Sequence, residues 1–259
     1  MTEEFTLALC ALIRRLGLEA KQLRDKGLTV EQKGRQDFVS QADVYVETQL
    51  RKWLKEQRPQ DGLLGEERGL EPGSEGTWVI DPIDGTTNFI LGMDYWCISV
   101  AWVCDNRIEL GIIYAPDREE FFFARAGHGA FLNDRRLTLA EPSPDAIVLG
   151  VGRSSRRAPR EYTDALEKLL EQGVEHRRFG AGALMLAHVA AGLVHGYYEA
   201  HLHSWDALAG LVLISEAGGR HNDFLADDGL TNGNTAWAAT PAVWQRLQPL
   251  LLPAGKPLA

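Results

Sequence analysis

Cysteine is scarce in this chain of 259 residues, which contains only Cys10, Cys97 and Cys104. Three cysteines without a closely spaced pair exclude a disulfide framework and a cysteine-rich zinc site. We therefore expect three reduced thiols in apolar surroundings and a cytoplasmic location.

The sequence also lacks a long apolar run and a recognisable targeting segment. No stretch approaches the roughly 20 apolar residues that a membrane-spanning helix needs. Glu3 and Glu4 precede the first apolar run, whereas a secretory signal begins with basic residues followed by an apolar core. These absences predict a soluble, unprocessed protein without a membrane partner.

Positive charge is in deficit, because 27 Lys and Arg face 36 Asp and Glu, for a formal net charge of −9. Nucleic acids and anionic membranes attract cationic surfaces, so this balance disfavours both as main partners. An acidic protein still binds a phosphate ester when a metal ion supplies the positive charge. The hydrophobic content of 45% is enough for a sizeable core in one domain or two tightly joined layers.

Two amphipathic helices are predicted near the amino terminus. Apolar residues recur at helical spacing from Phe5 to Leu23, and Gly27 follows where a C-terminal cap belongs. A second helix begins after Ser40, a typical N-cap with Asp43 three positions later, and Pro59 closes it.

Further along the chain the pattern changes twice. Residues 77–133 contain short β-type runs separated by turn formers, which predicts an antiparallel meander. Beyond it, strand-like and helix-like segments alternate, which is typical of α/β structure. We expect an α+β half at residues 1–140, with most metal ligands, and an α/β half at 141–259, with the substrate rim and one metal ligand, in one compact unit.

The stretch VIDPIDGTTNF, residues 79–89, places two acids at the end of an apolar strand. Asp81 ends the strand, the turn after Pro82 can expose the Ile83 carbonyl, and Asp84 stands where an N-cap would. Backbone N–H groups of the following Gly-Thr-Thr-Asn turn would suit an anion. Carboxylates repel an anion unless a divalent cation bridges them, and oxygen ligands without His or Cys suit Mg²⁺ or Mn²⁺.

Each of these signals has a structural alternative. Asp81 and Asp84 together fit a simple turn cap, Asp206 fits an acid that complements a helix dipole, and Glu66 fits a solvated loop charge. Three histidines close together, at positions 195, 201 and 203, are better explained as core or interface residues than as metal ligands.

Four segments together resemble the inositol monophosphatase family, within the lithium-sensitive, Mg²⁺-dependent phosphatases that include fructose-bisphosphatases. They are DFVSQAD at 37–43, GEE at 65–67, WVIDPIDGTTNF at 78–89 and YYEAHLHSWDALAGLVLISEAGG at 197–219. Their order is that of the family, and the resemblance covers essentially the whole chain. It implies a layered αβαβα sandwich of the sugar-phosphatase type, and a homodimer.

The resemblance implies two or three metal ions in each site. Glu66, Asp81 and the Ile83 carbonyl would hold the first ion, Asp81, Asp84 and Asp206 the second, and Glu66 would help a weaker third. Direct attack by water, without a phosphoenzyme, would follow, with the second ion stabilising the leaving oxygen.

The family pattern also implies catalytic and phosphate-binding residues. Gly85 and Thr86 would donate backbone N–H groups to the phosphate. The Thr86 hydroxyl, paired with Asp43, would orient and help deprotonate the attacking water, and Glu66 would assist. Asp43 also fits a capping box with Ser40, and both roles are compatible.

Substrate preference depends on the pocket rim. Glu199 falls where relatives that act on inositol phosphates present a carboxylate to ring hydroxyls, and the turn of Gly180, Ala181 and Gly182 lacks the hydroxyl residue that many of them carry. Ser154 and Ser155 fit either a substrate contact or a solvated loop.

The resemblance thus predicts a phosphomonoesterase for inositol monophosphate or a similar polyol or sugar phosphate. Histidinol phosphate, fructose 1,6-bisphosphate and 3′-phosphoadenosine 5′-phosphate remain alternative substrates, since metal and phosphate ligands do not depend on the leaving group. A catalytically silent regulatory relative is a further alternative. The complete set of expected metal and water ligands favours an active enzyme over a catalytically silent relative.

Overall fold

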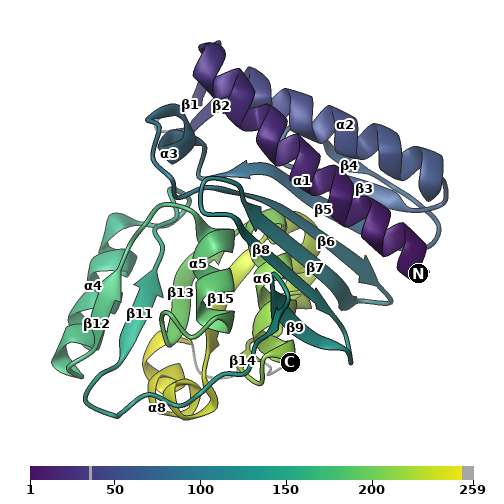
Figure 1. Ribbon diagram of the computed structural model, residues 1–259. Helices are drawn as coiled ribbons and strands as arrows, with labels where there is room; N and C mark the ends of the chain where they lie inside the picture. The colour runs from purple at the N-terminus through teal and green to yellow at the C-terminus, as the bar shows by residue number, and fades with distance from the viewer. Residues whose placement is uncertain (35–36, 253–259) are drawn as a thin grey trace.

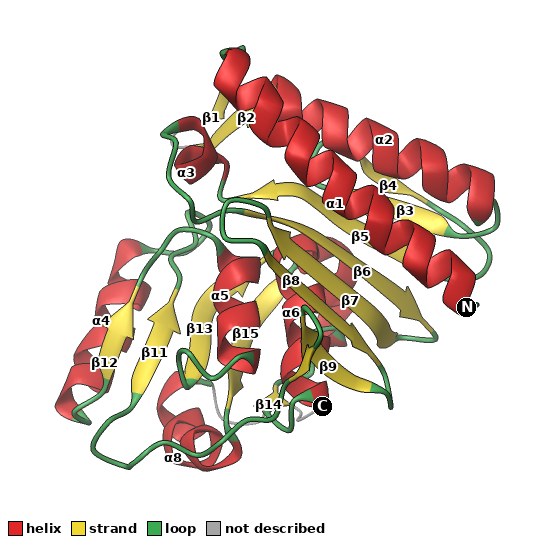
Figure 2. Ribbon diagram, viewed as in Figure 1, coloured by secondary structure: helices red, strands yellow, loops and turns green. Residues whose placement is uncertain are grey.

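Two long helices cover one face of the largest sheet, as Figures 1 and 2 show for the computed structural model, which describes residues 1–34 and 37–252. Helix α1 spans Glu3–Lys26 and is capped by Thr2 and Gly27. Helix α2 spans Gln41–Gln57. Both helices were predicted from their apolar spacing and caps, and both predictions are confirmed. A short hairpin of β1 (Val30–Gly34) and β2 (Asp37–Ser40) joins them.

The largest sheet has eight strands in the order β10-β9-β8-β7-β6-β5-β3-β4. From β5 to β9 neighbouring strands pair antiparallel in sequence order, which confirms the predicted meander. Strand β3 pairs parallel with β5 on the other side, a feature the sequence pattern did not predict. The strands are β3 (Gly62–Gly65), β4 (Gly69–Glu71), β5 (Thr77–Asp84), β6 (Cys97–Cys104), β7 (Arg107–Ala115), β8 (Glu120–Arg125), β9 (Gly129–Leu132) and β10 (Arg135–Arg136).

A second, mixed sheet follows in the order β12-β11-β13-β15-β14. Strand β11 pairs parallel with both β12 and β13, whereas β15 pairs antiparallel with β13 and β14. Helices α4 (Pro159–Glu171) and α8 (Pro241–Leu251) pack on its outer face. The strands are β11 (Val148–Val151), β12 (Glu175–Arg177), β13 (Gly196–Leu202), β14 (Arg220–His221) and β15 (Asn234–Ala239).

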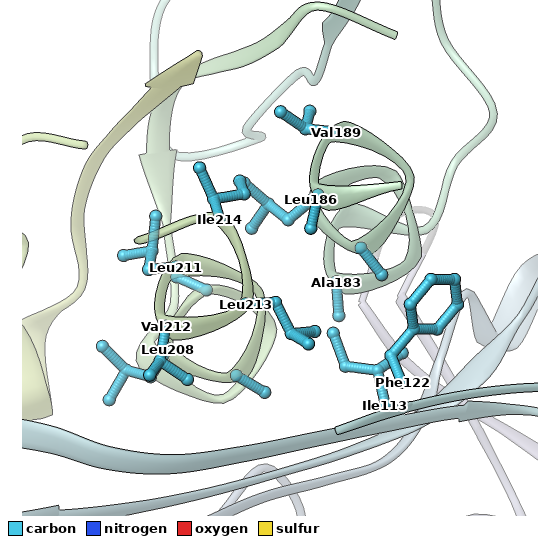
Figure 3. Packing of buried hydrophobic residues seen from close by; sticks show 14 of the residues in the cluster. Ile113, Phe122, Ala183, Leu186, Val189, Leu208, Leu211, Val212, Leu213 and Ile214 are labelled. Atoms are coloured by element: carbon cyan, nitrogen blue, oxygen red, sulfur yellow. The ribbon is translucent and has the colours of Figure 1, made fainter. Parts of the chain in front are cut away.

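Helices α5 (Gly182–Ala190) and α6 (Ser204–Glu216) fill the space between the two sheets. Both are apolar on almost every side, as expected for helices that sheets cover on two faces. In Figure 3, Ile113 and Phe122 of the large sheet meet Ala183 and Leu213 of the two helices. The layer order is therefore αβαβα, which confirms the fold implied by the resemblance.

The two sheets use separate stretches of the chain. The last strand of the large sheet ends at Arg136, and the first strand of the second sheet begins at Val148. A short helical segment, a 3-10 turn at Ala226–Asp228 followed by α7 (Gly229–Asn232), precedes β15. The division into halves at 1–140 and 141–259 stays a prediction. The three cysteines are free, with Cys97 buried and the other two partly buried. Within the described ranges, every helix is too short or too polar to cross a membrane.

Candidate active site

Three carboxylates meet where strand β5 ends and helix α6 begins. Asp81 and Asp84 stand on either side of an irregularity in the pairing of β5 with β6, at the position of Pro82 and Ile83. Asp206 lies in the first turn of α6, and this helix packs against strands β5, β6 and β7 of the large sheet. Oxygens of the three side chains all lie within 4.8 Å of one another. Independent turn caps would not converge on one point in this way.

Burial and mutual repulsion both act on these acids. The pKa of Asp81 is raised well above its usual value by burial first and then by Glu66, Asp206 and Asp84. The pKa of Asp206 is raised by burial, Asp84 and Glu66. Grouped carboxylates of this kind disfavour their charged forms unless a cation neutralises them. Because all the donors are oxygens, the cluster fits Mg²⁺ or Mn²⁺ rather than zinc or copper.

Glu66 approaches this cluster from strand β3. Its backbone N–H donates to the carbonyl of Ile80, 3.2 Å away, which holds the Glu66 turn alongside the end of β5. The turn is supported by Glu47, which accepts from the N–H of Glu67 at 2.8 Å and pairs with Arg51 at 2.7 Å. Glu66 is not one of the three acids within 4.8 Å, but it lies close enough to raise the pKa of Asp81.

Asp84 does not cap the helix that follows it, which corrects the sequence interpretation. Gly85, with a left-handed φ of 88°, is the N-cap of α3 (Thr86–Ile90). Asp84 instead accepts backbone N–H groups from Gly182, Ala183 and Leu184 at 2.8–3.2 Å, at the start of α5. Burial raises the pKa of Asp84 to about 6, and these three donors oppose the rise. The distance of 98 to 100 positions along the chain explains why spacing could not reveal the contact.

Asp43 and Thr86 are brought together as the resemblance implied. The Thr86 hydroxyl lies 3.2 Å from Asp43 Oδ1 and 2.9 Å from the Ile83 carbonyl. Because it carries one proton, it donates to one of these acceptors at a time. Asp43 Oδ2 accepts from the N–H of Ser40 at 2.8 Å and from its hydroxyl at 2.6 Å, so the capping box is also present. Burial raises the pKa of Asp43, and the bonds from Ser40 and Thr86 oppose that rise.

The turn after Asp84 packs closely against the turn that precedes α5. A Cβ at Gly85 would lie 3.0 Å from the Ala181 Cβ and 3.1 Å from the Tyr95 carbonyl, so only glycine fits without displacing them. The amide of Asn88 donates to the carbonyls of Tyr95 and Phe179, both at 2.7 Å. These contacts fix the segment that leads to Gly180 against helix α3. The role of Asn88 was not predicted.

A pocket of about 180 Å³ opens beside the acids and is lined by Asp84, Asp206 and the Gly180, Ala181 and Gly182 turn. Glu199 lies in the same pocket and accepts a 2.6 Å hydrogen bond from Tyr197. Burial raises the pKa of Glu199 to about 7, although the Tyr197 hydroxyl opposes this.

Other residues singled out from the sequence lie elsewhere. Ser154 and Ser155 belong to the loop between β11 and α4 and do not line the pocket. Within that loop, the Ser154 hydroxyl accepts from the N–H of Arg156 at 3.2 Å. His195 accepts from the N–H of Val148 at 3.0 Å, and His203 stacks on Trp205. Among the described residues, the histidines do not join the acids in a metal-ligating group.

The two basic residues at the pocket, Arg153 and Arg178, were not predicted. Each follows a strand of the second sheet, and the available signal was a basic residue just beyond a short β-type run. Cys97 was also missed, although its thiol lies 3.6 Å from Asp84 Oδ2.

Known proteins are similar to this chain both in sequence and in the arrangement of layers. An inositol-1-monophosphatase from Mesorhizobium japonicum is 39% identical over 240 residues, which are 90% of this chain and 89% of that protein. A Nus factor SuhB from Xylella fastidiosa is 39% identical over 204 residues, 78% of this chain and 74% of that protein.

Solved structures agree with the sequence relatives. The extragenic suppressor protein suhB from Bartonella henselae superposes with a TM-score of 0.88 at 31% identity, over 97% of this chain and all of that one. An IMPase from Thermotoga maritima superposes with a TM-score of 0.84 at 26% identity, over 96% of this chain and 97% of that one. The model of the inositol monophosphatase family matches residues 1–255. With sequence and fold matched over nearly its full length, the chain belongs to the inositol monophosphatase family.

Proposed function

We propose that this protein is a Mg²⁺-dependent phosphomonoesterase that hydrolyses inositol monophosphate or a similar polyol phosphate. The observation that carries the proposal is the convergence of Asp81, Asp84 and Asp206 within 4.8 Å at the edge of a pocket that also contains Glu199. A cluster of mutually repelling acids, two buried and one half-buried, is unfavourable in its charged form unless it binds cations. Its position next to a small polar pocket supports a metal-assisted reaction on a small ester.

The residues that would hold two or three ions are Glu66, Asp81, Asp84, Asp206 and the Ile83 carbonyl. When bound, Mg²⁺ would neutralise the phosphate and make a water molecule easier to deprotonate. The N–H groups of Gly85 and Thr86 would donate to phosphate oxygens, since they open helix α3. The Thr86 hydroxyl, which lies 3.2 Å from Asp43, would orient the attacking water and pass its proton toward that carboxylate.

The pocket favours a small leaving group. Its volume of about 180 Å³ lies below the roughly 300–1,000 Å³ of pockets that enclose drug-sized ligands. A sugar or polyol ring suits this space better than a nucleotide such as 3′-phosphoadenosine 5′-phosphate. Histidinol phosphate and fructose 1,6-bisphosphate stay alternative substrates. Glu199 would accept hydrogen bonds from ring hydroxyls, because Tyr197 is bonded to only one of its two oxygens.

The main test is phosphate release from inositol 1-phosphate with and without Mg²⁺. The intact protein is expected to release phosphate only with the metal, and Asp206→Asn is expected to lose nearly all turnover. Asp164→Asn, on the outer helix α4, is the matched control and is expected to keep full activity. No metal-dependent turnover on any of the candidate esters would contradict the proposal.

A second experiment tests the polyol contact. Glu199→Gln keeps the size of the side chain but removes its charge, so it accepts more weakly from ring hydroxyls. We expect kcat/KM for inositol 1-phosphate to fall roughly tenfold or more, with a smaller loss on a small aryl phosphate that has no hydroxyls to bind. Equal losses on both substrates would remove Glu199 from substrate recognition.

A regulatory role is the second candidate, because a relative at 39% identity is named a Nus factor. A regulatory role of this kind would not need the metal ligands. Asp81→Asn would then abolish phosphate release but leave the regulatory activity unchanged. A homodimer and a cytoplasmic location are also proposals, to be tested by light scattering and by fractionation of the source cells.

A further inference from the structure

One face of helix α2 carries three buried charged side chains. Asp43, Glu47 and Arg51 follow one another at intervals of four positions and therefore lie one above the other on the helix. Asp43 contacts the Thr86 hydroxyl at the start of α3. Glu47 and Arg51 contact the turn between β3 and β4, which carries Glu66. One helix thus touches two separate parts of the acidic site.

Glu47 holds the β3–β4 turn through its carboxylate, which is fully buried. Its Oε2 accepts from the N–H of Glu67 at 2.8 Å, and its Oε1 accepts from Arg51 Nε at 2.7 Å. The carboxylate also packs directly on the backbone of Gly65, because a Cβ at that position would collide with it. A single side chain therefore fixes the residues on both sides of Glu66.

Arg51 holds the far end of the same turn. One of its terminal nitrogens donates to the carbonyl of Gly69 at 2.5 Å, where β4 begins. The other lies 3.7 Å from Glu71, which also pairs with Lys55 at 2.6 Å. Since Arg51 is bonded to Glu47, the two side chains together span the whole turn from β3 to β4.

The cost of burying this ion pair indicates what the pair contributes. Removing two charges from water costs about as much as their attraction returns, so apolar side chains of similar size would often stabilise the fold equally well. Apolar side chains would not supply a directed acceptor for the Glu67 N–H or a directed donor for the Gly69 carbonyl. The pair therefore contributes more to the position of the turn than to stability. Position matters here because Glu66 approaches Asp81 from the end of β3, whereas Asp81 belongs to β5.

We propose that Glu47, held in place by Arg51, is a positioning residue for Glu66, and that this pair sets how tightly the site binds the ion that Glu66 would coordinate. The inference rests on the proposed function, because it takes Glu66 as a metal ligand. Groups that orient a metal ligand typically change metal affinity ten- to a hundredfold when they are removed. Glu47 acts through the turn and not through contact with the phosphate.

The main variant is Glu47→Leu combined with Arg51→Met. It replaces both charges with apolar side chains of similar size, so the net charge of the protein is unchanged and no buried charge is left without its partner. Without metal, it is expected to melt close to the temperature of the intact protein. Isothermal titration calorimetry is expected to show Mg²⁺ binding that is weaker by roughly tenfold or more.

Two further measurements separate positioning from simple packing. Amide hydrogen exchange of residues 66–69 in the metal-free variant should be faster than in the intact protein, because the Glu67 N–H has lost its acceptor. Phosphate release from inositol 1-phosphate should fall at limiting Mg²⁺ and recover most of its kcat as Mg²⁺ is raised. KM for the ester should change little, because Glu199 and the turn before α5 are unaltered.

The matched control removes another ion pair, by Arg58→Met combined with Asp61→Leu. These side chains are 2.9 Å apart at the opposite end of β3, where Asp61 also accepts from the Trp78 indole N–H at 2.8 Å. The control is expected to melt at a lower temperature than the intact protein but to keep its Mg²⁺ affinity. If the main variant does not fold, Glu47→Gln replaces it, since an amide has one acceptor oxygen for the two donors and is also expected to weaken Mg²⁺ binding.

The outcomes separate this inference from the proposed function. Absence of both Mg²⁺ binding and metal-dependent phosphate release in the intact protein overturns the proposed function. Metal-dependent release by the intact protein, together with normal Mg²⁺ affinity in the folded variant at Glu47, overturns only the positioning role, whatever the exchange rates are. Equal weakening of Mg²⁺ binding in the control overturns it as well, because the effect would then follow from lost stability.

Discussion

At the scale of single residues, the acids of this site are more informative together than apart. The end of an apolar strand and the turn after it predicted Asp81 and Asp84 beside an anion site, whereas Asp206 was implied as a metal ligand by the family resemblance. The sequence did not reveal that Asp84 also holds the start of α5 through three backbone N–H groups, because that contact joins residues about a hundred positions apart. Local patterns and the resemblance together therefore identified the carboxylates, but not the contacts between distant segments that orient them.

Asp206→Asn provides a prediction about stability without metal. Burial and the neighbouring acids raise the pKa of Asp206, so its charged form destabilises the folded protein. This cost is absent below the unfolded pKa of about 3.9 and grows as the pH rises toward the folded value. At pH 7.5 in EDTA, we expect Asp206→Asn to melt at a higher temperature than the intact protein.

Added Mg²⁺ should reverse this order. A ligand that binds only the folded state stabilises it by mass action, and Asp206→Asn lacks one of the proposed metal ligands. Differential scanning calorimetry with and without Mg²⁺ measures both effects, with Asp164→Asn as the surface control. If the metal-free Asp206→Asn protein melts at a lower temperature than the intact one, repulsion among the carboxylates does not destabilise the metal-free fold.

Glu199 provides a prediction about pH. Its folded pKa is raised from 4.5 to about 7, with burial as the main cause. The ionised carboxylate therefore destabilises the folded state increasingly as the pH rises from about 4.5 to about 7. Above pH 7 this cost levels off at about 3 kcal/mol. Glu199→Gln has no such loss. Urea unfolding without metal should show that the variant gains stability relative to the intact protein between pH 5 and pH 8.

The control for this pH effect is Glu167→Gln, a change on the exposed face of α4. Its difference from the intact protein should be nearly constant over the same pH range. Parallel stability profiles for Glu199→Gln and the intact protein would show that Glu199 titrates as it does in the unfolded chain.

At the scale of elements, periodicity and capping predicted most helices and the meander. Helix α2 follows its N-cap Ser40 with the predicted capping box, and α1 ends before its C-cap Gly27. The parallel pairing of β3 with β5 was not predicted, because four buried residues in a row carry no alternation that distinguishes a strand from a helix. Since Glu66 follows β3, its approach to Asp81 depended on the pairing that the sequence could not reveal.

Ser40 links the stability of an element to the site. Its hydroxyl accepts from the N–H of Ala42 at 3.1 Å and donates to Asp43 Oδ2 at 2.6 Å. Ser40→Ala should cost about 1 kcal/mol of unfolding free energy as a lost N-cap. It should also raise the pKa of Asp43, since the Ser40 bond lowers that pKa. We expect the acidic limb of the kcat profile to move to higher pH.

Thr2→Ala is the control for this prediction. Thr2 caps α1 through a 3.3 Å bond from the N–H of Phe5, far along the chain from the acids. A similar loss of stability with an unchanged pH profile is expected. If Ser40→Ala also leaves the pH profile unchanged, the capping box serves only the helix.

At the scale of the whole molecule, the order of the layers brings the site together. Helices α5 and α6 lie between the sheets, and their first turns carry the Asp84 contact and Asp206 (Figure 1). The alternation of segments predicted α/β structure in this half of the chain but could not say which sheet faces each side of these helices. The resemblance supplied that order, because its motifs cover the whole chain. The site is therefore a property of the stacking and not of any one layer.

Gly210→Ala tests this dependence on stacking. A Cβ at Gly210 would collide with Leu186 of α5, so the substitution forces the two helices apart and should cost about 1–3 kcal/mol. Separation would move Asp206, on α6, relative to Asp84, which is bound to α5, so kcat/KM and Mg²⁺ affinity should both fall. Val243→Ala in α8 leaves a cavity of comparable cost in the outer layer and should keep full activity where folded. Unchanged Mg²⁺ affinity in a folded Gly210→Ala protein would show that the acids keep their positions independently of the contact between α5 and α6.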